Sequence, residues 1–166
     1  RLALVIGNAA YREAPLANPV NDARAMTAAL RLAGFEVISR ENATHIDMLQ
    51  ALREFGDKLK AQRGTGLFYF AGHGVQVKGR NFLIPVGSRI EREDEVAGLS
   101  IDVGHVLGKM ESANNPLNML ILDACRNNPF VRSFRSSQQG LAQMDAPVGS
   151  LVAFATALGS VAHDGQ

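Results

Sequence analysis

The sequence has one cysteine, almost no net charge and no long hydrophobic run, and each shortage excludes a class of protein. The single Cys125 rules out an internal disulfide framework and any zinc site built from four thiolates. Because 17 basic residues nearly balance 16 acidic ones, the net charge of +1 gives no bulk attraction to nucleic acid or to an anionic membrane. No apolar run approaches the roughly 20 residues that cross a bilayer, and no signal-peptide pattern opens the chain. We therefore expect a soluble segment.

Apolar residues are plentiful enough for one core. A chain of 166 residues, 46% of them hydrophobic, has the size and composition of a single globular domain. It begins with Arg1 directly before an apolar run. Such an abrupt start predicts a fragment of a longer protein.

Apolar runs that fit buried strands alternate with segments of helical spacing. Strands are expected at residues 2–6, 35–39, 67–71, 118–122 and 150–157, and helices at 19–33, 46–59 and 102–110. Residues 75–77 and 81–85, which flank Lys78-Gly79, indicate a hairpin. The alternation predicts a mostly parallel α/β sheet with helices on both faces, a fold class whose sites form beyond the carboxyl ends of the strands. Residues 126–149 follow neither period and are expected to form a long exposed loop.

Two side chains capable of covalent chemistry follow two of these strands. His73 lies between two glycines after residues 67–71, and Cys125 follows residues 118–122. A thiolate is a good nucleophile, and a nearby imidazole can lower the pKa of the thiol and later protonate the leaving group. The backbone amides of Gly74 and Cys125 could together polarise a carbonyl oxygen. Taken singly, a cysteine and a histidine are more often buried or capping residues, and it is their pairing that favours catalysis.

The segments around this pair resemble a known family. The histidine motif precedes the cysteine motif by about 50 residues, the separation typical of caspases. The two motifs are Tyr69-Phe70-Ala71-Gly72-His73-Gly74 and Leu120-Ile121-Leu122-Asp123-Ala124-Cys125-Arg126-Asn127. Further similar segments are Leu4-Val5-Ile6-Gly7-Asn8, Asn21-Asp22-Ala23 and Ala155-Thr156-Ala157. Over essentially its whole length, the chain resembles the caspase and metacaspase peptidases, most of all the bacterial caspase-like proteins called orthocaspases.

This resemblance implies a caspase-like (caspase-hemoglobinase) α/β fold and a cysteine endopeptidase. His73 would be the general acid and base, and Cys125 the nucleophile. Residues 1–166 would form one catalytic domain: residues 1–125 would correspond to a large subunit, residues 126–149 to a processing loop, and residues 150–166 to the start of a small subunit. The final strand and helices of the fold would be missing. The expected compartment is the bacterial cytoplasm or periplasm.

The resemblance also implies a substrate pocket lined by Asp22, Asp123, Ala155 and Thr156. Asp123 stands where the caspase signature has glutamine, so cleavage after aspartate is not expected. Two carboxylates in one partly desolvated pocket repel each other, and a guanidinium relieves that repulsion while donating to both. We therefore predict cleavage after Arg, then Lys, in protein or peptide substrates. As an alternative, Asp22 could serve only as a first-turn acid that stabilises its helix.

Self-processing is a further expectation. Arg132 and Arg135 lie in the predicted processing loop and would suit a peptidase that cleaves after basic residues. The alternative is that both arginines simply solvate the loop.

No cofactor is expected, and calcium is the alternative. Many metacaspases need calcium, and the charged run at residues 91–95 could supply oxygen ligands, although such a run is more often a solvated loop. Gly87 stands where related sequences often have an aspartate. His45, His105 and His163 show no metal-ligand spacing.

Two rival functions come from other classes. A catalytically idle caspase-like module could act as a scaffold, because a fold alone does not fix a function. A nucleotide-binding domain is disfavoured, since no phosphate-binding loop follows any predicted strand.

Overall fold

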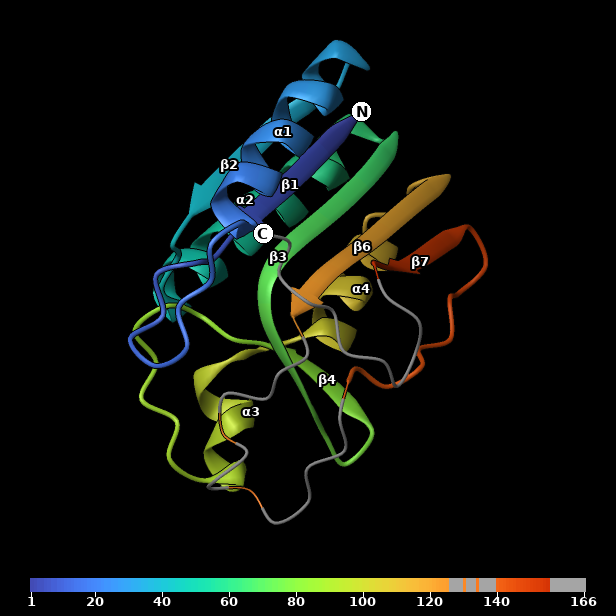
Figure 1. Ribbon diagram of the computed structural model, residues 1–166. Coiled ribbons are helices and arrows are strands. Elements are labelled where there is room, and N and C mark those ends of the chain that lie inside the picture. Colours follow the sequence, from blue (N-terminus) through green and yellow to red (C-terminus); the bar gives the residue numbers. More distant parts are fainter. Residues whose placement is uncertain (126–129, 131–133, 135–139, 156–166) are drawn as a thin grey trace.

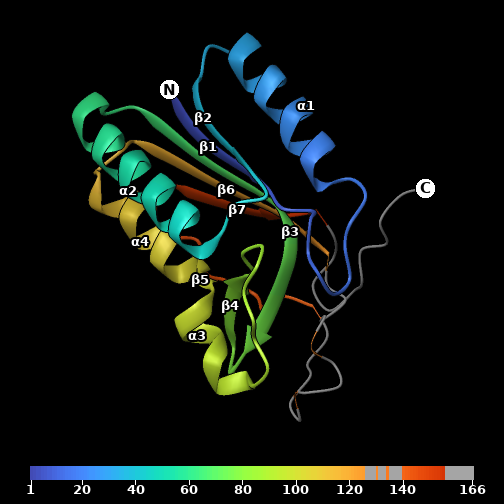
Figure 2. The ribbon, with the colours of Figure 1, turned by 90° about the vertical axis from the view of Figure 1, so that its left-hand side faces the viewer.

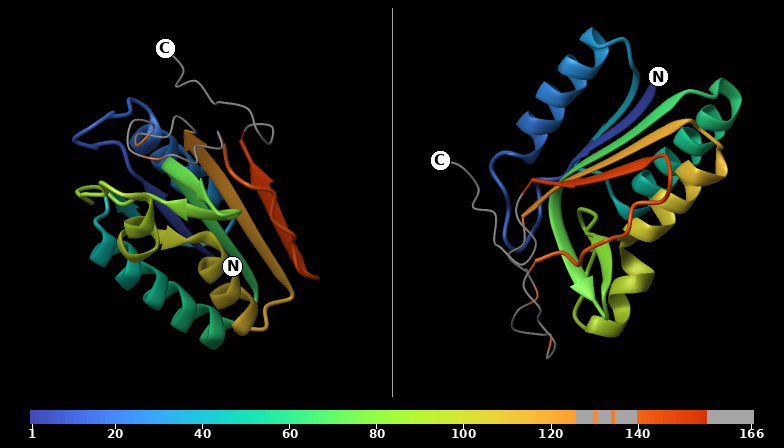
Figure 3. Two further views of the ribbon diagram at one scale, coloured as in Figure 1. Left: turned by 90° about the horizontal axis from the view of Figure 1, so that it is seen from below. Right: turned by 90° about the vertical axis from the view of Figure 1, so that its right-hand side faces the viewer.

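A mostly parallel sheet is the frame of the computed structural model, which describes residues 1–125, 130, 134 and 140–155 (Figure 1). Parallel strands lie side by side in the order β2, β1, β3, β6, β7. Their bounds are Glu36–Glu41, Leu2–Gly7, Thr65–Val77, Leu117–Cys125 and Ser150–Phe154. The antiparallel strands β4 (Arg80–Leu83) and β5 (Ile101–Asp102) extend the far end of β3. Figure 3 shows β7 at the outer edge, beside β6.

Helices cover both faces of the sheet, as the sequence predicts (Figure 2). Helix α1 (Pro19–Leu32) lies on one face, and α2 (His45–Gln62) and α4 (Val103–Ser112) lie on the other. Side chains of β3 alternate between the two layers, so Phe68 and Phe70 pack with α2 and α4 while Tyr69 packs with α1. No helix among the residues that the structure describes is both long and apolar enough to cross a membrane.

Strands β3 and β6 run further than the sequence predicts. The segment Gly72-His73-Gly74, expected as the polar end of a strand, lies inside β3, because that strand continues into the hairpin with β4. Strand β6 likewise continues to Cys125, which pairs with His73. The two residues were expected just beyond their strands, and this was wrong. They form the last paired position between β3 and β6.

The charged run at residues 91–95 is also more ordered than expected. Part of it forms a short 3-10 turn, η1 (Glu93–Glu95), which leads into α3 (Val96–Leu99). The Glu95 carboxylate accepts hydrogen bonds from the amides of Glu91 and Arg92, at 2.9 and 3.2 Å, and Val96 is fully buried. An acidic side chain that caps these amides and an apolar anchor behind it explain why the run is not simply a solvated loop.

The described end of the predicted processing loop lies against the fold. Residues 141–149 form no helix or strand, in agreement with the prediction. Leu141 is nevertheless buried, and Asn81 of β4 pairs its amide group with both backbone groups of Ala142, at 2.8 and 2.7 Å. This end of the loop is therefore anchored and not fully exposed.

The contact between Gly7 and α1 gives the first prediction. A Cβ atom on Gly7 would lie 2.5 Å from the Pro19 carbonyl oxygen and 2.6 Å from the Ala23 Cβ, so the helix packs directly on the strand backbone. We expect Gly7→Ala to lower the free energy of unfolding by about 1–3 kcal/mol, because backbone must shift to admit the methyl group. Urea unfolding monitored by circular dichroism measures the change.

Gly108→Ala is the matched control. It lies within α4, and a Cβ there meets nothing within 4 Å. The same substitution should raise the free energy of unfolding by about 0.5–1 kcal/mol, the usual preference of a helix interior for alanine. Equal effects at the two glycines would contradict the close packing of α1 on β1.

Candidate active site

The candidate site lies at the edge where the parallel strands end. The register places His73 of β3 directly opposite Cys125 of β6, with the backbones one strand spacing, about 5 Å, apart. The two residues therefore lie on neighbouring strands. The loop between β1 and α1, residues 8–18, meets β3 at the same edge.

The imidazole of His73 is held by a backbone carbonyl. Its Nε2 lies 2.7 Å from the oxygen of Ala14, which adopts the left-handed conformation at φ 59°. A carbonyl oxygen only accepts hydrogen bonds, so Nε2 carries the proton of the neutral ring and Nδ1 is its basic nitrogen. His73 is 1% exposed. It is buried because the β1–α1 loop covers it.

Tyr11 is a site residue that the sequence patterns did not indicate. Its ring centroid lies 4.4 Å from that of His73, and its hydroxyl accepts a hydrogen bond from the His73 amide at 3.0 Å. The same hydroxyl donates to the carbonyl of Ile84 at 2.9 Å. An aromatic residue shortly after the first strand, at the edge where sites form, is the signal that could have indicated it.

Gly74 lies next to the His73–Cys125 pair. Backbone groups alternate in direction along a strand, and those of His73 face Tyr11 and Ile84. The amide of Gly74 therefore points toward β6. A Cβ at this position would lie 3.0 Å from the Ala124 Cβ and 3.1 Å from Leu141, so a side chain fits poorly there.

Asp123 and Asp22 both act on the phenol of Tyr69. Asp123 is half-buried in β6, and its Oδ2 accepts a hydrogen bond from the Tyr69 hydroxyl at 3.1 Å. Burial raises the pKa of Tyr69 far above its ordinary value, the charge and hydrogen bond of Asp123 add to this, and the charge of Asp22 adds further. Asp22 is exposed in the first turn of α1. The two carboxylates thus lie on the α1 side of the sheet, around one tyrosine.

The other predicted site residues are only partly described. The amide of Ala155 donates to the Leu122 carbonyl at 3.0 Å, which keeps this residue beside β6. Thr156, Arg132 and Arg135 lie outside the described residues. Within the described ranges, no three His, Cys, Asp or Glu side chains cluster as metal ligands would.

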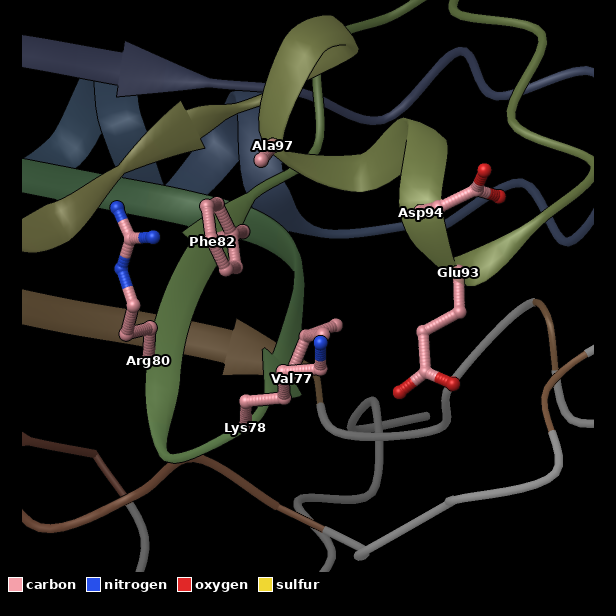
Figure 4. A pocket seen from close by; sticks show the side chains of 7 residues that line it. All are labelled: Val77, Lys78, Arg80, Phe82, Glu93, Asp94 and Ala97. Atoms are coloured by element: carbon pink, nitrogen blue, oxygen red, sulfur yellow. The ribbon is translucent and has the colours of Figure 1, made fainter.

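A separate hollow of about 490 Å³ lies between the β3–β4 hairpin and the η1–α3 turn (Figure 4). The guanidinium of Arg80 lies 5.3 Å from the Phe82 ring centre and pairs with Asp102. The hollow is lined by Val77, Lys78, Arg80, Phe82, Glu93, Asp94 and Ala97. Glu93 and Asp94 of the charged run line it, but none of the residues predicted for catalysis, substrate binding or self-cleavage does, so it does not belong to the candidate active site.

Comparisons with known proteins agree on one family. A family model described as "Caspase domain" matches residues 1–166. The human protein "Mucosa-associated lymphoid tissue lymphoma translocation protein 1" is 36% identical over 128 residues, which cover 76% of this chain and 15% of that protein. Its mouse homolog is 35% identical over 128 residues, with the same coverage. The chain thus spans about 15% of the length of these relatives.

A solved structure shows the same fold. The Drosophila initiator caspase Dronc superposes with a TM-score of 0.58 at 12% sequence identity, over 93% of this chain and 53% of that one. At this identity the likeness concerns the fold alone, and it confirms the caspase-like sheet expected from the sequence.

The surroundings of Tyr69 predict its titration. Tyr69 should keep its proton well above pH 10, about where an ordinary phenol ionises, because burial and the Asp123 carboxylate raise its pKa. The native state then binds this proton more tightly than the unfolded state. Its contribution to stability is complete below about pH 10 and is lost as the pH rises through the raised native pKa. The phenolate absorbance of the folded protein and the pH dependence of urea unfolding measure both effects.

Asp123→Asn is the control for this titration. Loss of the carboxylate charge should bring the pKa of Tyr69 some of the way back, while burial still holds it above the ordinary value. Ionisation of Tyr69 at an ordinary pKa in the folded wild-type protein would contradict the arrangement.

Proposed function

The chain belongs to the caspase domain family, and from that membership we propose that it is a cysteine endopeptidase in which Cys125 is the nucleophile and His73 the general acid and base. The pairing of His73 with Cys125 across β3 and β6 is the observation that carries the proposal. Two residues fixed on rigid neighbouring strands meet the first requirement of such a pair, which is a short, constant separation.

The proposed reaction follows ordinary thiol chemistry. Nδ1 of His73 takes the proton of the Cys125 thiol, and the thiolate sulfur attacks the carbonyl carbon of the scissile peptide bond. The imidazolium then gives its proton to the departing amine, which leaves a thioester on Cys125. Water, deprotonated by His73, hydrolyses this thioester and restores the thiol. The amides of Gly74 and Cys125 are proposed to stabilise the oxyanion.

The carbonyl of Ala14 has a clear role in this scheme. Its contact with Nε2 at 2.7 Å keeps the imidazole in the tautomer whose basic nitrogen is Nδ1. The same oxygen stabilises the doubly protonated imidazolium that forms after proton transfer, because the bond from Nε2 becomes charge-assisted.

Asp22 and Asp123 are proposed to select a basic residue before the scissile bond. Tyr69 holds Oδ2 of Asp123, which leaves its second oxygen to meet a guanidinium or ammonium group. The effect of both carboxylates on Tyr69 supports a shared negative region at this edge. An aspartate side chain would add a third negative charge. The proposed preference is therefore Arg, then Lys, with Ala155 and Thr156 bordering the pocket.

Other properties follow from the same proposal. Self-cleavage after Arg132 or Arg135 is proposed as processing by the enzyme itself, and the reaction needs no cofactor. Calcium is less favoured than a run of acidic residues implies, because Glu95 caps two amides and Asp94 pairs with Arg92 at 2.9 Å. The proposed partners are protein or peptide substrates, with no nucleic acid or membrane.

The catalytic pair predicts a matched set of variants. Cys125→Ala and His73→Gln should each abolish hydrolysis of peptides with Arg before the cleaved bond; glutamine is chosen because His73 is buried and needs a polar replacement. A covalent probe for activated thiols should label the wild type and not Cys125→Ala. Mass spectrometry of stored protein should find new termini after Arg132 or Arg135 in the wild type alone. Absence of labelling and of hydrolysis in folded wild-type protein would favour a caspase-like scaffold.

The pocket proposal predicts a loss specific to Asp123. Asp123→Ala should lower kcat/KM on Arg substrates by tens to thousands of fold, since removal of one partner from a desolvated charge pair costs about 2–5 kcal/mol. Asp57→Ala, which removes an exposed carboxylate from α2 on the other side of the sheet, should leave kcat/KM unchanged. A peptide library that varies the residue before the cleaved bond measures both. Preferred turnover of Asp substrates would contradict the assignment.

A further inference from the structure

We propose that Tyr11 is a positioning residue for His73, acting through both its hydroxyl and its ring. This proposal rests on the proposed peptidase function. It adds a residue from the β1–α1 loop to a pair that lies on β3 and β6.

The hydroxyl of Tyr11 is inserted into the ladder between β3 and β4. Ile84 lies opposite His73, and the Ile84 amide donates to the His73 carbonyl at 2.9 Å. In a regular antiparallel pair the His73 amide would return a bond to the Ile84 carbonyl. Here the Tyr11 hydroxyl stands between them, 3.0 Å from the His73 nitrogen and 2.9 Å from the Ile84 oxygen. The backbone of His73 is therefore fixed by a side chain and not by strand pairing alone.

The ring of Tyr11 fixes the imidazole itself. The two rings are tilted by 53° with centroids 4.4 Å apart, and Tyr11 and His73 are 8% and 1% exposed. A tilted aromatic contact of this kind restricts rotation of the smaller ring. The Ala14 carbonyl, three residues further along the same loop, holds Nε2. One loop thus constrains the backbone, one side of the ring and one ring nitrogen of His73.

The neighbouring residues make room for this arrangement. A Cβ atom on Gly72 would lie 2.7 Å from the Tyr11 hydroxyl oxygen, so the hydroxyl reaches the ladder because residue 72 has no side chain. Asn8 anchors the loop. Its side-chain Oδ1 accepts a hydrogen bond from the Ala43 amide at 2.8 Å, and its backbone amide donates to the Ala71 carbonyl at 2.8 Å. The hydroxyl position is therefore set by a rigid loop.

Loss of His73 positioning and loss of substrate binding should affect different kinetic constants, kcat in the first case and KM in the second. Tyr11 contacts His73 and the strand backbone, whereas Tyr69, the second of the two tyrosines in the chain, contacts the proposed pocket carboxylate. We expect Tyr11→Phe to lower kcat at least tenfold with KM unchanged, and equally for Arg and Lys substrates. Tyr69→Phe should instead raise KM and reduce the preference for Arg over Lys. The two variants lose the same atom, which makes them matched controls for each other.

Nuclear magnetic resonance of the histidine ring gives a readout that does not depend on activity. Wild-type His73 should carry its proton on Nε2, and its backbone amide should exchange slowly. In Tyr11→Phe, the His73 amide should exchange at least tenfold faster, because the hydroxyl that accepts from it is lost, whereas Tyr69→Phe should leave this exchange unchanged. A wild type with these signatures but without hydrolysis would overturn the peptidase function and not the positioning role.

Two results would overturn the positioning role. One is a folded Tyr11→Phe protein that keeps the wild-type kcat and the slow exchange of the His73 amide. The other needs no variant, and so decides the matter if Tyr11→Phe does not fold: a wild-type His73 that is protonated on Nδ1, or whose amide exchanges as fast as an exposed one.

Discussion

The parallel pairing of β3 with β6 is the interaction on which the rest of the structure depends. It places His73 opposite Cys125, and the same register buries Phe68 and Phe70 together with Leu120 and Leu122. Because side chains alternate along a strand, a slip of one residue would turn these apolar residues to the wrong face. The free energy of burying the core therefore also fixes the geometry of the candidate site. No separate interaction has to bring the two strands into register.

Strand pairing alone does not fix the direction of the His73 imidazole, and the β1–α1 loop provides the additional contacts. A side chain at a strand end can adopt several rotamers, so its direction needs further contacts. The loop provides them through Tyr11 and the carbonyl of Ala14, and Asn8 ties the loop to the sheet with buried hydrogen bonds. Buried polar groups of this kind are costly to leave unpaired, typically about 1–3 kcal/mol each. The loop is consequently integral to the fold and not an appendage to it.

Much of this fold could be predicted from hydrophobic periodicity, and the failures have physical causes. Continuous apolar runs identified the parallel strands, and helical spacing identified α2, which the structure shows to begin with a capping box of Thr44 and Asp47. The continuation of β3 through His73 could not be predicted, because Gly72-His73-Gly74 is polar and flexible in isolation and becomes a strand only through partners distant in sequence. The role of Ala14 is invisible in sequence for a different reason: its contribution is a backbone carbonyl, which every residue has.

Asp123 and Cys125 occupy alternate positions of one strand, so they belong to the same face of the sheet, as the proposed function requires of them. Asp123 and Cys125 are two residues apart on β6, a separation of about 7 Å along the strand. Under the proposed function, a long basic side chain bound at Asp123 would therefore place its own carbonyl near the His73–Cys125 pair. The buried Tyr69 keeps its own proton and donates a hydrogen bond to Asp123, which stabilises the charge of this half-buried carboxylate. The stabilised carboxylate and the proposed catalytic pair thus lie within one short stretch of sheet.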